Sequence, residues 1–179
     1  NYGDDGRSEV ILDGAGNVLV ASCTQSRNFP VIGSPFQDTL RGSQDGVLIK
    51  LTPDLGSILF SSFLGGNSND AAYVLSIAPN GSIYVAGGTE SDTNSFPGNE
   101  TGTIGSMNNG GIDGFVAIVN SSGTAVIRST FIGTTGTDQV FGIQFDNKGF
   151  PYITGQTTGN WQVSNATYSN AGGKQFIAK

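Results

Sequence analysis

The sequence contains no histidine, one cysteine and few charged residues. Without histidine the chain lacks the commonest general base and metal ligand, so Ser-His-Asp and Cys-His catalytic arrangements are excluded within it. Cys23 has no second cysteine to pair with, so the fold does not depend on an internal disulfide. Its neighbours place Cys23 on a strand, where a buried and unreactive thiol is expected.

Charge is scarce as well, and its balance is acidic. Only 12% of the residues are charged, against about 25% in an average globular domain. Eight basic and fourteen acidic residues give a net charge of −6, and no basic run is present. The sequence therefore lacks the electrostatic signature of nucleic-acid binding. No apolar run reaches the about 20 residues of a transmembrane helix, so no membrane span is predicted.

Glycine, by contrast, is abundant, with 28 residues in a chain of 179. A disordered chain combines higher net charge with fewer apolar residues than the 36% found here. Short runs of Val, Ile, Phe and Tyr alternate with clusters of Gly, Asn and Ser. No segment has a helical period bounded by capping residues. This pattern predicts an all-β protein with many tight turns.

The most informative feature is an internal repeat. Two series of residues recur with spacings of 65 and 68: Asp5, Asp70 and Asp138, and Gly16, Gly81 and Gly149. A later part of the unit repeats too, because Asp45–Leu51 matches Asp113–Val119 at an offset of 68. We expect one domain over residues 1–179, with repeat units at approximately 1–64, 65–132 and 133–179, the last incomplete.

Each unit divides into four short strands. In the second unit we expect them at about 72–78, 82–88, 114–120 and 125–131, with a polar surface loop over 91–111. Four antiparallel strands repeated in series are typical of β-propeller blades, so the sequence predicts about 2.7 blades of a larger propeller. A β-solenoid is the alternative, although its coils are shorter and more uniform. A β-sandwich would leave the repeat unexplained.

Several repeated strings resemble a known family. They are residues 63–70 and 80–89, Asn28-Phe29-Pro30, Pro35-Phe36-Gln37 and Asp45–Leu51. Together they resemble the SBBP repeat, the seven-bladed β-propeller repeat of bacterial exported proteins, and the resemblance covers nearly the whole chain. It implies a propeller on a large secreted or surface-anchored bacterial protein. It implies no shared catalytic residue.

The third unit departs from this pattern and the repeat count does not close a ring. Trp161-Gln162 stands where the earlier units have Phe29-Pro30 and Phe96-Pro97. Propellers have about four to eight blades, so the units present are too few. Because the chain begins and ends within a unit, we expect a fragment of a longer protein. Closure by several chains, and an open array capped by a partner, are the alternatives.

Aspartates at the start of the repeated strands are the candidate metal ligands. Asp5, Asp70 and Asp138 precede the first strand of each unit and could bind calcium through their carboxylates. A short aspartate in a tight turn also accepts backbone N–H groups. We favour the turn role, because calcium needs six to eight oxygens, and we interpret Asp45 and Asp113 in the same way. No other cofactor is predicted.

Two further features of the sequence are candidate sites. Trp161 lies in a loop and has no tryptophan at the matching positions, which makes it the candidate for stacking on a glycan. The acidic residues Glu90 and Asp92 could suggest acid/base catalysis. Neighbouring acids in a polar loop are more often solvated charges, so we predict no catalytic residue.

The sequence therefore predicts a non-catalytic scaffold, exported or displayed on the bacterial cell surface, for adhesion through protein–protein or glycan interactions. Its expected partners are other blades of the same protein, another protein chain or a glycan. One alternative is part of a propeller enzyme or lectin whose site lies on other blades. Another is a secreted cargo or subunit bound to a secretion or surface complex.

Overall fold

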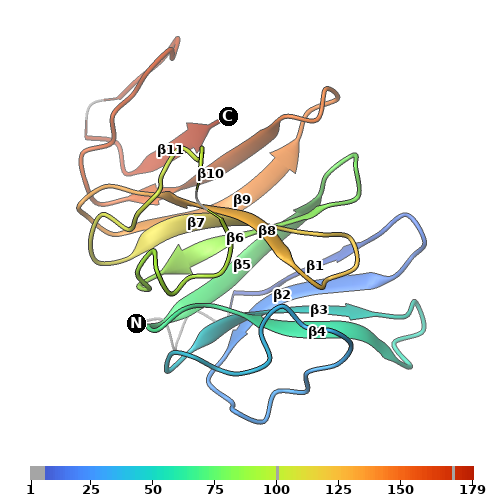
Figure 1. Cartoon of the computed structure of the whole chain (residues 1–179). Helices are drawn as coiled ribbons and strands as arrows, with labels where there is room; N and C mark the ends of the chain where they lie inside the picture. The colour runs from blue at the N-terminus through green and yellow to red at the C-terminus, as the bar shows by residue number, and fades with distance from the viewer. Residues whose placement is uncertain (1–6, 100, 171) are drawn as a thin grey trace.

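The computed structural model describes residues 7–99, 101–170 and 172–179, and these residues form strands, turns and loops without a helix. The strands make three antiparallel sheets (Figure 1). Sheet 1 contains β1 (Glu9–Leu12), β2 (Val18–Thr24), β3 (Asp45–Leu51) and β4 (Ile58–Leu64). Sheet 2 contains β5 (Asp70–Ile77), β6 (Ile83–Thr89), β7 (Asp113–Val119) and β8 (Val126–Ile132). Sheet 3 contains β9 (Asp138–Phe145), β10 (Pro151–Thr157) and β11 (Gln175–Ala178).

Every sheet is a simple meander in which strands next to each other in sequence are hydrogen-bonded neighbours. The all-β prediction is confirmed for the described residues. The four strands expected in the second unit are present, and each boundary lies within two residues of its predicted position. Each sheet corresponds to one repeat unit of the sequence.

Glycine at one turn position explains why the first hairpin of each sheet has the same shape. Gly16, Gly81 and Gly149 have φ values of 81°, 84° and 83°. This left-handed backbone conformation is accessible to glycine at little cost, whereas a side chain there would be strained. The repeated glycines therefore set the strand register in all three units.

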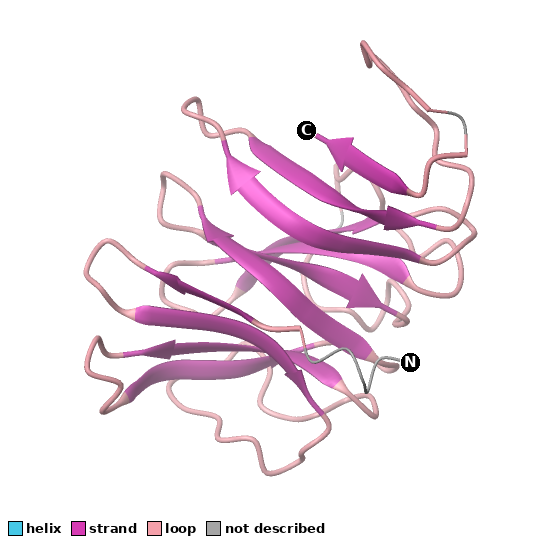
Figure 2. Cartoon of the chain, turned by 180° about the vertical axis from the view of Figure 1, so that it is seen from behind, coloured by secondary structure: helices cyan, strands magenta, loops and turns pink. Residues whose placement is uncertain are grey.

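The three sheets are stacked face to face along the chain, as Figure 2 shows from behind. β5 packs across β2 and β3, and β9 packs across β6 and β7. Between sheets 1 and 2 the core contains Leu48, Leu75 and Phe115, all fully buried. Between sheets 2 and 3 it contains Val116 and Val140. Each sheet thus buries an apolar face against the next one, and the described strands do not close into a barrel.

The loop over 91–111 only partly fits the prediction that it lies on the surface. Phe96, within this loop, is 4% exposed. Its ring centroid lies 4.8 Å from that of Phe115 and 5.8 Å from that of Phe131. Phe29 in the corresponding loop of the first unit lies 5.1 Å from Phe63. The Phe-Pro pair at this position thus packs its ring on the underlying sheet, because burying an aromatic ring offsets the entropy of ordering the loop.

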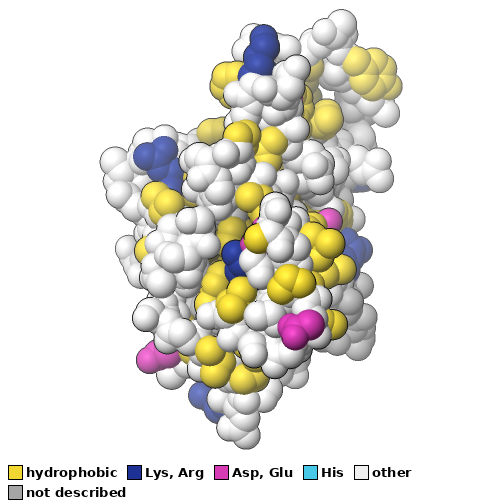
Figure 3. All heavy atoms as spheres, turned by 90° about the vertical axis from the view of Figure 1, so that its right-hand side faces the viewer, with side chains coloured by type: hydrophobic (Ala, Val, Ile, Leu, Met, Phe, Trp, Pro, Cys, Tyr) yellow, Lys and Arg dark blue, Asp and Glu magenta, His cyan; other side chains and the backbone are white. Residues whose placement is uncertain are grey.

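The low charge predicted from composition is visible on the surface. Figure 3 shows one face of the molecule, on which basic and acidic side chains are few and scattered among uncharged polar and hydrophobic ones. Among the described residues two salt bridges are present, Lys50–Asp13 and Lys179–Asp146, both at hairpin ends or strand termini. Electrostatic pairing therefore contributes little to holding the sheets together.

Candidate functional site

Two β-bulges at the same repeat position distort β5 and β9, the first strands of sheets 2 and 3. In β5, Ala72 pairs with Gly87 and Val74 pairs with Ala86, which leaves Tyr73 outside the ladder. In β9, the ladder passes over Phe141 in the same way. A bulge redirects the side chain of the extra residue, and bulges are frequent beside functional sites. The two aromatic rings are therefore placed by matching distortions of the first strands.

A glycine opposite each bulge makes this distortion sterically feasible. A Cβ atom on Gly87 would lie 1.9 Å from the carbonyl oxygen of Ala71, and one on Gly155 would lie 2.0 Å from that of Gln139. Neither approach is compatible with a side chain. Sheet 1 has Ser22 at this position, and there the Ser22 and Ser8 hydroxyls lie 2.7 Å apart beside the short strand β1. The repeated glycines thus mark the two sheets whose first strand carries a bulge.

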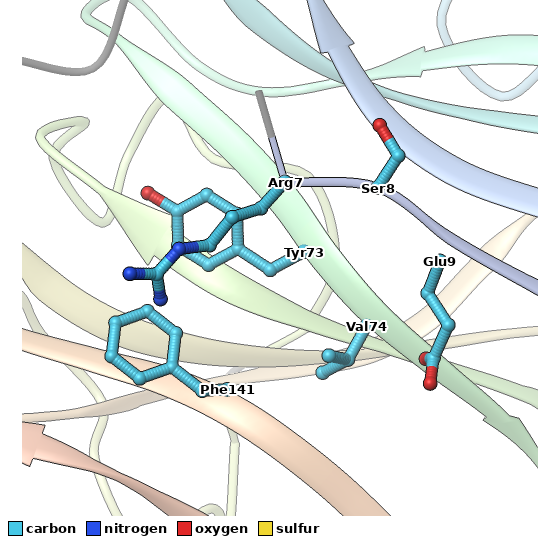
Figure 4. Close-up of a pocket in the computed structure, with 6 residues that line it drawn as sticks. All are labelled: Arg7, Ser8, Glu9, Tyr73, Val74 and Phe141. Atoms are coloured by element: carbon cyan, nitrogen blue, oxygen red, sulfur yellow. The ribbon is translucent and has the colours of Figure 1, made fainter. Parts of the chain in front are cut away.

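A hollow of about 330 Å³ lies where the first strands β1, β5 and β9 come together. Its lining residues are Arg7, Ser8, Glu9, Tyr73, Val74 and Phe141. Figure 4 shows the Arg7 side chain extending toward the two rings, while the Glu9 carboxylate points away from the guanidinium. The hollow therefore combines an exposed cation with aromatic surface, which suits recognition better than acid/base chemistry.

Among the described residues, the Arg7 guanidinium contacts aromatic rings and forms no salt bridge with a carboxylate. Its central carbon lies 3.9 Å from the centroid of Phe141 and 5.7 Å from that of Tyr73. Cation–π contacts of this kind are worth about 0.5–2 kcal/mol, depending on exposure. Arg7 is exposed and Phe141 is half-buried, so a ligand entering the hollow would meet the guanidinium first. Carboxylate and phosphate groups are the partners that a guanidinium binds through two parallel hydrogen bonds.

Hydrogen bonds fix the floor of the hollow. The Tyr73 hydroxyl accepts a bond from Gln139 Nε2 at 3.0 Å, and Gln139 Oε1 accepts one from Gln156 Nε2 at 2.9 Å. Glu9 Oε2 accepts a bond from the backbone N–H of Leu75 at 2.6 Å. These side chains join β10, β9, β5 and β1, so the relative positions of the first strands are set by polar contacts as well as packing.

A second repeated feature is a pair of buried aspartates at each junction between sheets. At the first junction, Asp45 Oδ2 accepts bonds from Gln37 Nε2 at 2.6 Å and from the N–H of Arg41 at 3.0 Å. Asp70 accepts bonds from the N–H of Gly66 and the hydroxyls of Ser91 and Thr89. Both carboxylates are fully buried. Hydrogen-bond donors of the protein thus satisfy both carboxylates at this junction.

The second junction, between sheets 2 and 3, is built from Asp113 and Asp138 with different donors. Asp138 Oδ2 accepts bonds from both the N–H and the hydroxyl of Thr134, at 2.6 and 2.8 Å. Thr134 occupies the repeat position of Gly66, and Gly159 occupies that of Ser91. A Cβ on Gly159 would lie 1.9 Å from Thr134 Oγ1. The hydroxyl that donates to Asp138 Oδ2 therefore comes from the turn before β9, whereas the hydroxyl that donates to Asp70 Oδ2 comes from Ser91, after β6.

Burial changes the acidity of these carboxyls. Desolvation raises the pKa of Asp70 to about 7, although Thr89, Gly66 and Ser91 donate hydrogen bonds that favour its ionised form. Desolvation also raises the pKa of Asp113, to about 6, and the nearby charge of Asp138 adds to the shift. Burial raises the pKa of Asp45 too. Without histidine, buried aspartates are the side chains that titrate near neutral pH.

The structure places the sequence-predicted candidates in different environments. Asp70 and Asp138 accept backbone N–H groups from the turns before their strands, as the turn interpretation predicts. Asp5 lies outside the described residues. Trp161 is half-buried and stacks on Phe176, with ring centroids 4.1 Å apart, so one ring face is covered by the protein. Glycan stacking on its other face stays a prediction.

The hollow was missed by sequence reasoning, although a signal was present. Tyr73 and Phe141 occupy the same repeat position, as do the glycines opposite them. An aromatic residue facing a glycine across a hairpin in two copies indicates a bulge. Arg7 carries no such signal, because its contacts depend on the packing of β1 against β5.

Clusters that would indicate other sites are not found within the described part of the chain. No three His, Cys, Asp or Glu side chains among residues 7–99, 101–170 and 172–179 gather in a way that could hold a metal ion. The same residues include no helix of the length and hydrophobicity needed to cross a membrane. Comparison with known proteins adds no assignment: no protein-family model matches the chain, and no curated protein sequence shows significant similarity to it.

Proposed function

We propose that sheets 1, 2 and 3 are successive blades of a β-propeller. Each sheet is a meander formed by one repeat unit, and the sheets stack in chain order. Their first strands, β1, β5 and β9, lie next to one another at one edge. In a propeller the first strand of every blade faces the central channel, so the hollow between these strands would open into that channel.

Closure of the ring gives the first test of this proposal. Propellers have about four to eight blades, so at least one more blade must come from a longer natural polypeptide or from further copies of the chain. Light scattering of that polypeptide should give a compact particle with a mass of four or more repeat units. This chain alone, of 18.4 kDa, should self-associate through the outer faces of sheets 1 and 3, which no other described sheet covers. A stable, folded monomer of this chain would contradict the proposal.

The proposed role is a non-catalytic scaffold of an exported or surface-displayed bacterial protein, which mediates adhesion by binding a glycan or protein. The resemblance to the SBBP repeat supports the location. The observation that carries the binding role is the hollow, where matching bulges place Tyr73 and Phe141 beside the exposed Arg7. Ring faces pack on sugar rings or apolar side chains, and the guanidinium binds a carboxylate.

Binding of acidic ligands provides the second test. On an array containing acidic oligosaccharides and acidic peptides, we expect a retained ligand whose affinity falls about tenfold or more in Arg7→Ala, because a central arginine commonly carries at least that much binding energy. Phe141→Ala should weaken binding as well, through loss of the ring that holds Arg7.

The matched control is Arg128→Ala. Arg128 is an exposed arginine on β8, at the outer edge of sheet 2, and its removal should leave binding unchanged. Equal binding by the Arg7 and Arg128 variants would show that the hollow is not the site. Hydrolysis of an array ligand would favour the enzyme alternative.

A further inference from the structure

The second junction contains two buried carboxylate oxygens that have no hydrogen-bond partner among the described residues. They are Asp113 Oδ1 and Asp138 Oδ1, and both side chains are fully buried. Within the described residues these are the buried side-chain polar atoms without a hydrogen-bond partner. An unsatisfied carboxylate oxygen inside a protein is destabilising, because the hydration that it loses on folding is not replaced, so the arrangement calls for a compensating group.

The first junction shows what has been lost. There, the N–H of Gly42 donates to Asp45 Oδ1 at 3.1 Å. The equivalent N–H in the second junction belongs to Gly110 and instead donates to Asn108 Oδ1 at 2.9 Å. Likewise, Asp70 Oδ1 accepts a bond from Thr89, whereas its counterpart Asp138 Oδ1 has no partner. Thr157 stands at the repeat position of Thr89, and its hydroxyl accepts a bond from the N–H of Gly159. Two hydrogen bonds of the first junction, rather than the donor groups themselves, are therefore absent from the second.

A side chain that bridges the first junction is also missing at the second. Gln37 Nε2 donates to Asp45 at 2.6 Å, while Gln37 Oε1 accepts from the N–H of Gly65 at 3.0 Å. The equivalent residue in the second unit is Gly105, which has no side chain to bridge the junction. A Cβ added there would lie 2.0 Å from the carbonyl oxygen of Phe131, so backbone stands where the amide side chain begins in the first unit.

The two orphaned oxygens belong to neighbouring carboxylates enclosed by backbone. The backbone N–H of Asp138 donates to the carbonyl of Ile112, the neighbour of Asp113, at 2.7 Å, and the charge of Asp138 raises the pKa of Asp113. Gly133 lies against Asp113, because a Cβ added to it would be 2.4 Å from Asp113 Oδ1. The equivalent Gly65 lies against both Asp45 and Asp70.

We propose that Asp113 Oδ1 and Asp138 Oδ1 are two ligands of a calcium ion at the junction between sheets 2 and 3. Carboxylate, carbonyl and hydroxyl oxygens are hard ligands, and neither histidine nor a cysteine on either sheet is at hand to bind a softer metal. Calcium accepts irregular oxygen sites completed by carbonyl groups and water, whereas magnesium demands a near-ideal octahedron. With two carboxylates the affinity should lie at about 10⁻⁴–10⁻³ M, the range of extracellular calcium modules.

The site is independent of the hollow and of the proposed binding role. One of its ligands, Asp138, was a calcium candidate in the sequence, but its partner is Asp113 on the third strand of the preceding unit rather than Asp5 or Asp70. The ion would connect β7 to β9 and thereby fix sheet 3 on sheet 2. Its effect should therefore appear as stability of the chain, whether or not a ligand binds in the hollow.

Thermal unfolding in the presence of calcium chloride tests this inference. The protein is first treated with a chelator, and calcium is then titrated at constant ionic strength while Tm and the heat of binding are recorded. At tenfold above the dissociation constant we expect Tm to rise by about 3–6 °C, the size of shift that mass action gives for a chain of this length. Calorimetry should give a stoichiometry near one.

Matched variants separate this site from general ion effects. Asp113→Asn should abolish the calcium response, while the new amide can donate to Asp138 Oδ1 and keep the chelated protein folded. Asp45→Asn makes the same change at the first junction and should retain the full response. A Tm independent of calcium, an equal response to magnesium, or a calcium-responsive Asp113→Asn variant would overturn the proposal. Stabilisation of the chelated protein by acid alone, with no calcium effect, would instead indicate a proton shared by the two carboxyls.

Discussion

The protein should lose stability as the pH rises from about 5 to about 8. Asp70 is the main cause, because burial raises its pKa to about 7 from the 3.8 of an exposed aspartate. The folded state then holds a proton that the unfolded state has released, so stability is greatest at low pH and falls as the pH passes through the folded pKa. Linkage gives a loss of about 2–3 kcal/mol over this window.

The charged groups around Asp70 do not reverse this sign. Asp45 lies across the junction, and its charge raises the pKa of Asp70 further. Arg41 acts on Asp45, whose own pKa is nevertheless raised by burial. No histidine titrates in the window, since the chain has none. The dependence of the free energy of unfolding on pH in this window therefore arises from buried carboxyl groups.

Urea denaturation at closely spaced pH values, in a buffer that contains a chelator, measures this effect. Asp70→Asn should flatten the part of the slope between about pH 6 and about pH 8, because an amide does not titrate. Asp54→Asn serves as the control, since Asp54 is exposed and its pKa is lowered by hydrogen bonds from Thr52 and Gly56. Stability that rises from pH 5 to pH 8, or an unchanged slope in Asp70→Asn, would contradict the assignment.

Gly87→Ala should be among the most damaging single substitutions in the chain. The added methyl group would lie 1.9 Å from the carbonyl oxygen of Ala71, which is backbone and cannot turn aside. Relief requires the bulge in β5 to move, and Tyr73 would move with it. We expect the free energy of unfolding to fall by about 3 kcal/mol, at the upper end of overpacking penalties.

The same substitution elsewhere provides the control for Gly87→Ala. Gly14 has no heavy atom within 4 Å of an added Cβ, and its φ is not positive. Gly14→Ala should therefore change the free energy of unfolding by less than about 0.5 kcal/mol, as surface substitutions usually do. Equal effects at Gly14 and Gly87, measured by urea denaturation, would mean that the bulge does not require a glycine.

Periodicity was sufficient to predict the strands but not the packing of the loops. The strands of the second unit were predicted to within two residues because their apolar runs lie between turn residues such as Gly81 and Gly123. The polar neighbours of Phe96 predict a surface loop. Its burial depends on rings from β7 and β8, which no local pattern contains.

The candidate sites divide in the same way. The turn role of Asp70 and Asp138 could be predicted, since an aspartate before a strand finds backbone N–H groups within a few residues. The pairing of Asp113 with Asp138, and the placement of Arg7 on Phe141, could not, because the partners come from different sheets. Sequence spacing carries no information on which carboxylates meet when two sheets stack.

The sequence by itself determined the repeat, the meander of short strands and the glycine-bearing turns, because these depend on contacts within a single hairpin. Only the tertiary structure decided which faces of the sheets meet, which aspartates are buried as pairs and where the first strands enclose a hollow. The physical reason is that burial and side-chain coupling arise between units, after each unit has formed its own sheet. Nearly identical repeats thus acquire different chemistry at their junctions, as the change from Gln37 to Gly105 illustrates.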